Sequence, residues 1–192
     1  MKVKETTSTY LTRKRPFTYQ DYLKLPEDDF RYQVINGGLV MTPSPITAHQ
    51  RVCERIGYEL SKYVERTKTG EVLRAPMDVV LSKENVYQPD ILFISNDNSQ
   101  IARENNIDGA PDLVIEVLSP ATSTYDLISK KENYQKYGVE EYWIVDPKQE
   151  WIEVYCNDHG EFKLESRLEK EGTVKSRLLK GFQVDMVHVF RR

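Results

Sequence analysis

Apolar positions follow two spacings along the chain, one typical of helices and one typical of strands. Residues 46–66 carry apolar side chains at helical intervals, which predicts an amphipathic helix of about five turns. A second helix is predicted over residues 125–137, because Gly138 supplies a typical helix C-terminus. Strands rich in Val, Ile, Tyr and Trp are predicted at residues 72–81, 90–94, 113–118, 142–145 and 152–155. This succession predicts an α/β or α+β fold, with a sheet flanked by helices.

Shorter elements are predicted on both sides of this core. Residues 17–25 favour a short helix that ends before Pro26. Residues 31–41 predict a hairpin, because the turn Asn36-Gly37-Gly38 separates two apolar runs. The last third of the chain predicts further strands, at residues 162–164, 173–174 and 182–189.

Length and composition indicate one globular domain. The 192 residues correspond to about 1.3 domains of ordinary size. Hydrophobic residues make up 39% of the chain and charged residues 30%, which excludes a wholly disordered protein. Residues 1–16 are polar and basic with few apolar side chains. We therefore expect a mobile N-terminal arm over residues 1–16 and a single domain over residues 17–192.

Net charge, cysteine content and hydropathy indicate which partners and which cellular compartment suit the chain. There are 27 Lys and Arg against 30 Asp and Glu, a formal net charge of −3, which disfavours binding of nucleic acid by overall charge but allows a local site. Cys53 and Cys156 lie far apart and form neither a zinc motif nor a disulfide framework, which favours a reducing compartment. No apolar run approaches the roughly 18 residues of a membrane span. We expect a soluble cytoplasmic protein.

Two carboxylates occupy positions in strands where a charge is costly. Asp90 opens the apolar run 91–94, and Glu116 lies in the middle of the apolar run 113–118. Because side chains alternate across a strand, Glu116 shares a face with Val114 and Leu118. If both faces of that strand are covered, Glu116 is partly buried. A buried carboxylate requires a cation, a metal ion or hydrogen-bond donors beside it.

The helix predicted over residues 125–137 offers such partners. At helical spacing, one stripe of this helix carries Asp126, Lys130, Tyr134 and Tyr137. One interpretation is structural, with Glu116 and Lys130 forming a buried ion pair that holds the helix on the sheet. The other is a Mg²⁺ or Mn²⁺ site, because both ions prefer hard oxygen ligands and a nearby lysine can orient water. The residues alone leave both interpretations open.

Several segments together resemble a known family. These are residues 17–45 (FTYQDYLKLPEDDFRYQVINGGLVMTPSP), His49-Gln50, residues 87–94 (YQPDILFI) and residues 111–146, which contain IEVLSP and GVEEYWIVD. In these segments the chain resembles the Uma2 family of bacterial proteins, which is assigned to the PD-(D/E)xK restriction-endonuclease-like superfamily. The resemblance spans residues 17–155.

The resemblance implies a restriction-endonuclease-like core, a mixed sheet flanked by helices. It implies a divalent ion, Mg²⁺ or Mn²⁺, held by Asp90 of the QPD motif, by Glu116 and by the carbonyl of Val117. The superfamily lysine usually follows the acidic residue by two positions, where this chain has Leu118. Lys130, on the following helix, occupies the matching place in this family.

Other residues are assigned supporting roles by the same resemblance. Gln33, His49, Asp126 and Tyr134 are expected to contact substrate or to support the site. The family hairpin commonly carries two acidic residues where this chain has Gln33 and Asn36. The amides bring no charge, which weakens the expected metal site. His49 begins the long helix, where a structural role and a phosphate or metal contact are both open.

Two functions from different classes follow. The first is a Mg²⁺-dependent endonuclease that hydrolyses phosphodiester bonds of nucleic acid, with DNA as the expected substrate and a homodimer as the expected assembly. Lys130, Lys131 and Lys136 would supply local positive potential. The second is a catalytically degenerate protein that keeps the fold as a binding or assembly module. A third interpretation is a nuclease-like component of a mobile element or defence system.

Overall fold

The computed structural model describes residues 9–11, 15–26, 30–42, 44–119 and 125–191. Most of the predicted N-terminal arm therefore lies outside the described residues. Within it, Thr9–Leu11 forms strand β1, which pairs antiparallel with β3 (Gly38–Thr42). No helix in the described part of the chain is long and apolar enough to cross a membrane.

The central sheet is mixed and has six strands in the order β12-β11-β10-β9-β7-β4. β9 and β10 run parallel and the other neighbours run antiparallel. The strands are β4 (Gly70–Arg74), β7 (Ile91–Ser95), β9 (Leu113–Val117), β10 (Glu141–Asp146), β11 (Trp151–Asp158) and β12 (Glu161–Glu169). The parallel step from β9 to β10 includes a helical connection, made of η2 (Tyr125–Lys130) and α3 (Lys131–Tyr137).

A second sheet of six strands has the order β1-β3-β2-β6-β5-β8, and β13 and β14 form a separate pair. The remaining strands are β2 (Arg31–Ile35), β5 (Val79–Ser82), β6 (Asn85–Tyr87), β8 (Ile107–Asp108), β13 (Thr173–Lys175) and β14 (Gln183–Asp185). The remaining helices are α1 (Tyr19–Tyr22), α2 (Thr47–Thr67), η1 (Asn96–Ile101) and α4 (Met186–Phe190). The predicted mixed sheet flanked by helices is confirmed.

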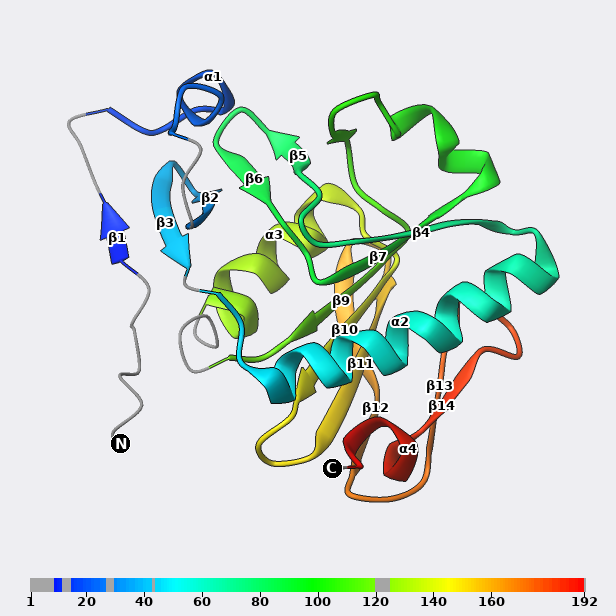
Figure 1. Ribbon diagram of the computed structural model, residues 1–192. Coiled ribbons are helices and arrows are strands. Elements are labelled where there is room, and N and C mark those ends of the chain that lie inside the picture. The colour runs from blue at the N-terminus through cyan, green and yellow to red at the C-terminus, as the bar shows by residue number, and fades with distance from the viewer. Residues whose placement is uncertain (1–8, 12–14, 27–29, 43, 120–124, 192) are drawn as a thin grey trace, which may run out of the picture.

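Both faces of the central sheet are covered, as Figure 1 shows with α2 and α3 on opposite sides. Leu113, Ile115 and Val117 of β9 belong to the core cluster that includes the buried residues of α2. Val114 and Leu118 belong to a second cluster, together with Tyr134 of α3. Because side chains alternate along β9, Glu116 lies on the α3 side, as its position in the sequence predicts.

Three predicted elements differ from the structure. The single strand predicted over residues 72–81 is wrong: β4 and β5 belong to different sheets, and Pro76 between them has no amide hydrogen to continue a ladder. The strand predicted over 182–189 ends at Asp185, whose side chain accepts a hydrogen bond from His188 N at 2.8 Å and caps α4. The helix predicted over 125–137 begins with a π-helical segment, η2, so its first residues do not follow α-helical spacing.

Candidate active site

Asp90 and Glu116 both lie where the ladder between β7 and β9 ends. The last pair of that antiparallel ladder joins Ile91 to Ile115. Continued by one residue on each strand, the same register places Asp90 opposite Glu116. The amide of Val117 donates a hydrogen bond to Oδ2 of Asp90 at 2.9 Å, which fixes the carboxylate against β9. Two residues far apart in sequence thus lie at the same end of one strand pair.

Glu116 is buried in a polar cluster on the α3 side of the sheet. Its side chain is 3% exposed, as is that of Lys130 at the end of η2. Lys130 Nζ donates to Oε1 of Glu116 at 2.9 Å, and the hydroxyl of Tyr134 donates to the same oxygen at 2.8 Å. Burial, and next the nearby charge of Glu116, raise the pKa of Tyr134 well above its usual range, so the phenol stays a donor. Lys130 and Tyr134 both reach Glu116.

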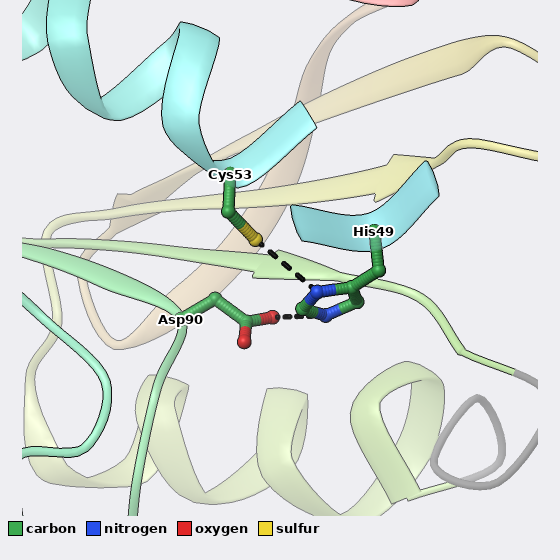
Figure 2. A group of neighbouring side chains, drawn as sticks. All are labelled: His49, Cys53 and Asp90. Atoms are coloured by element: carbon green, nitrogen blue, oxygen red, sulfur yellow. Dashed lines mark hydrogen bonds and ion pairs between the residues drawn. The ribbon is translucent and has the colours of Figure 1, made fainter. Parts of the chain in front are cut away.

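Asp90 lies in a chain of three polar side chains with His49 and Cys53 of α2 (Figure 2). His49 Nε2 is 3.1 Å from Oδ2 of Asp90, and His49 Nδ1 is 3.4 Å from Sγ of Cys53. Burial, and next the negative charges of Asp90 and Glu116, raise the pKa of the Cys53 thiol. A protonated thiol donates to Nδ1 while Nε2–H donates to Asp90, so one imidazole tautomer satisfies both contacts.

Sequence reasoning missed Cys53 as a member of this site. The sequence does indicate that Cys53 lies beside His49, because it follows His49 by four residues and side chains at that spacing lie on one face of a helix. Both side chains are on the side of α2 that faces the sheet, and Asp90 comes from a segment about 40 residues away.

Gln33 lies beside the site but contacts neither carboxylate through a hydrogen bond within the described residues. Its side chain is buried, and Oε1 accepts a hydrogen bond from the amide of Gln88 at 3.2 Å. Gln33 thus links β2 to the segment that leads into Asp90. Asn36 occupies the hairpin turn with a positive φ of 50°, and its Oδ1 accepts from Asn133 of α3 at 3.0 Å.

Two of the remaining predicted residues, Lys131 and Lys136, lie against aromatic rings. Asp126 lies in η2, and its side chain is outside the described residues. Lys131 is aimed at the ring of Tyr155, with Nζ 3.3 Å from the ring centroid. Burial lowers the pKa of Lys131. Nζ of Lys136 lies 5.3 Å from the ring centroid of Tyr137. Of the three lysines expected to supply positive potential, Lys130 is the one bonded to a carboxylate in the described structure.

Comparison with known proteins places the chain in a family. The Uma2 family model, described as "Putative restriction endonuclease", matches residues 19–187. Among solved structures, the fold is similar to the crystal structure of a "putative nuclease belonging to DUF820" from Anabaena variabilis ATCC 29413. The TM-score is 0.75 at 22% sequence identity, and the match covers 91% of this chain and 98% of that chain. No curated protein sequence matches. Because the family model spans both carboxylates and nearly all of the fold, the chain belongs to the Uma2 family.

Proposed function

We propose that this protein is a divalent-metal-dependent endonuclease that hydrolyses phosphodiester bonds of nucleic acid, with DNA as the substrate. The observation that supports the proposal is that Asp90 and Glu116 follow the same end of the β7–β9 ladder in register, with Lys130 bonded to Glu116. Membership of the family supports the nuclease class. The metal, the reaction and the roles of the residues are what the experiments below test.

The donor set fits Mg²⁺ or Mn²⁺. Both described hydrogen bonds to the Asp90 side chain end on Oδ2, so Oδ1 accepts none from the described residues. Asp90, Glu116 and the adjacent carbonyl of Val117 would hold the ion with hard oxygen ligands. A bound divalent ion supplies a water of lowered pKa and offsets phosphate charge.

The chain's own residues have distinct tasks in this proposal. Lys130 holds a positive charge beside Glu116, where it can orient the attacking water and neutralise developing charge on phosphate. Tyr134 fixes Oε1 of Glu116 through its hydroxyl. His49 orients the carboxylate of Asp90 from α2. Gln33 supports the segment before Asp90, and Asp126 remains a predicted support residue.

A buried ion pair is an expensive way to hold a helix on a sheet. Taking both charges out of water costs several kcal/mol per ion, and an apolar pair of equal volume often stabilises a fold equally well. The pair at Glu116 and Lys130 therefore favours a chemical role over a purely structural one.

A catalytically degenerate binding module is the second candidate. The observation that favours it is the hairpin, where Gln33 and Asn36 replace the acidic residues of the family pattern and bond to Gln88 and Asn133. Such a protein would fold without binding a divalent ion. The homodimer and the cytoplasmic location stay predictions; light scattering on the purified protein measures the first.

Metal binding and cleavage together decide between the two candidates. Calorimetry with Mn²⁺ and Mg²⁺ is compared for wild type, Asp90→Asn and Glu116→Gln, and nicking of supercoiled plasmid is followed with the same proteins. The expected result is loss of binding in both variants and a fall in cleavage on the order of 10²-fold or more. Asp158→Asn, which changes an aspartate of β11 bonded to Lys163, is the matched control.

Wild-type protein that binds neither ion would overturn the nuclease proposal and support the binding module. Cleavage by Glu116→Gln at the wild-type rate, with metal in excess, would overturn the assignment of the site. Melting curves of each variant, recorded without metal, establish that the comparison is made on folded protein.

A further inference from the structure

We infer that His49, Cys53 and Asp90 form a second metal site, specific for a thiophilic ion such as Zn²⁺ or Cd²⁺, that shares Asp90 with the proposed Mg²⁺ site. One ligand atom from each residue lies within 4.8 Å of the others. A thiol, an imidazole and a carboxylate make a donor set typical of Zn²⁺. Mg²⁺ prefers oxygen ligands and makes no use of sulfur.

The geometry of the two α2 residues fits a tetrahedral ion closely. Bond lengths of about 2.3 Å to sulfur and about 2.0 Å to nitrogen put those ligands about 3.5 Å apart in a tetrahedral site. Cys53 Sγ and His49 Nδ1 are already 3.4 Å apart. They are one helical turn apart on a rigid helix of 21 residues, so this pair is preformed.

Asp90 supplies the third ligand after leaving its present contact with the ring. Its Oδ2 lies 3.1 Å from His49 Nε2, whereas Cys53 Sγ lies beside Nδ1, so the three ligand atoms, already within 4.8 Å of one another, converge on one ion when the Asp90 carboxylate turns toward the Cys53 side of the imidazole. Oδ1, which accepts no hydrogen bond from the described residues, is the oxygen available for this. Water completes the fourth position, as in other zinc sites with three protein ligands. Binding replaces the Cys53 S–H bond with an S–metal bond, and the proton passes to solvent.

Because both metal sites use Asp90, the two sites cannot be occupied at the same time. A thiophilic ion held by Cys53 and His49 removes Asp90 from the oxygen ligands of Mg²⁺, so Zn²⁺ would inhibit the nuclease. This consequence rests on the proposed function, whereas binding of the thiophilic ion does not. The two ligand sets differ at one useful position, because Glu116 belongs to the proposed Mg²⁺ site alone.

Thiolate-to-metal charge-transfer absorbance during titration with Cd²⁺ tests the site directly. Wild type is expected to bind one ion with an absorbance band, and Cys53→Ser to lose the band. His49→Ala and Asp90→Asn are expected to bind more weakly by at least the roughly 10- to 100-fold typical of lost support at a metal site. The matched control is Cys156→Ser, since Cys156 also lies beside a carboxylate, 3.7 Å from Glu141 Oε2, but belongs to no such three-residue group among the described residues.

Glu116→Gln separates this inference from the proposed function. It is expected to lose Mn²⁺ binding while the Cd²⁺ band remains as in wild type. Absence of the band in wild type, its survival in Cys53→Ser, or its loss in Cys156→Ser would overturn the thiophilic site. A Cd²⁺ band in a protein that binds no Mn²⁺ would support the thiophilic site and overturn the nuclease proposal.

Discussion

At the scale of single residues, Glu116 and Lys130 form an ion pair in the interior of the fold. The two side chains are bonded at 2.9 Å, and both are almost fully removed from water. Their mutual attraction and the hydroxyl of Tyr134 offset the cost of desolvation. Loss of one partner leaves the other charge buried without this counter-ion, so each partner stabilises the fold strongly even if the pair as a whole does not.

Lys130→Met tests this asymmetry. The substitution keeps the volume of the side chain but leaves Glu116 without its cation, and we expect a loss of about 3–5 kcal/mol in the free energy of unfolding. Urea denaturation at neutral pH measures it. Lys163→Met removes a lysine from the exposed pair with Asp158 and is expected to leave the unfolding curve unchanged. Equal effects of the two substitutions would contradict the account.

Removal of one hydroxyl at the same cluster gives a smaller effect. Tyr134→Phe deletes the 2.8 Å hydrogen bond to Glu116 and keeps the buried ring. Since hydrogen bonds to charged groups contribute about 1.5–3 kcal/mol, we expect a loss of that size in urea denaturation. Tyr58→Phe, at an exposed position of α2, is the control and should match wild type. A Tyr134→Phe curve that overlays wild type would show that the hydroxyl stabilises nothing.

At the scale of elements, one buried carboxylate links the central sheet to a loop that packs against it. Glu141 at the start of β10 is fully buried, and its Oε2 accepts hydrogen bonds from the amides of Arg177 and Leu178, each at 2.8 Å. Its Oε1 accepts from Trp143 Nε1 at 2.7 Å. One carboxylate therefore holds the segment between β13 and β14 against the central sheet.

Glu141→Ala would leave these donors without a partner. Buried donors that lose their acceptor cost about 1–3 kcal/mol each, so we expect a loss of at least about 3 kcal/mol in chemical denaturation. Amide exchange should also accelerate at Arg177 and Leu178. Glu140→Ala, at the exposed neighbouring position, is the matched control. Unchanged exchange at Arg177 in Glu141→Ala would contradict the anchoring role.

At the scale of the whole molecule, buried acids with raised pKa values govern stability in alkali. Burial is the main cause that raises the pKa of four tyrosines above the ordinary value of 10.0, namely Tyr22, Tyr87, Tyr134 and Tyr155. Burial likewise raises the pKa of Cys156 to about 12. These groups keep their protons in the folded state at a pH where the unfolded chain has already lost them.

Stability should therefore begin to fall above about pH 9, the ordinary pKa of a thiol, and fall more steeply above about pH 10, where the tyrosines of the unfolded chain lose their protons. A group whose folded pKa is raised binds its proton more tightly in the folded state, so each one lowers the free energy of unfolding by up to about 1.4 kcal/mol per pH unit between its two pKa values. Thermal melts from pH 8 to pH 11 measure the fall. Tyr134→Phe should show a shallower slope than Tyr58→Phe. Equal slopes in the two variants would rule out a contribution from Tyr134.

The positions of the main elements follow from local sequence. The helix predicted over 46–66 is α2, and the hairpin around Asn36 forms because Asn36 and Gly37 adopt the positive φ values of its turn. The alternation along residues 113–118 also predicts the face on which Glu116 lies. Local patterns could not separate β4 from β5, because apolar residues continue on both sides of Pro76 while the two strands join different sheets.

The features of the candidate site also divide into those that local sequence indicates and those that only the fold brings together. The sequence alone determined that Asp90 precedes one apolar run, that Glu116 lies within another and that a lysine follows on the next helical segment, because hydrophobic periodicity is a pattern among neighbouring residues. Only the tertiary structure decided that β7 and β9 pair so that Asp90 and Glu116 follow the same end of their ladder. It also decided that Lys131 lies against Tyr155 while Lys130 reaches Glu116, and that Cys53 lies beside His49 and Asp90. Those contacts join segments distant in sequence, and the packing of the helices on the sheet sets their geometry.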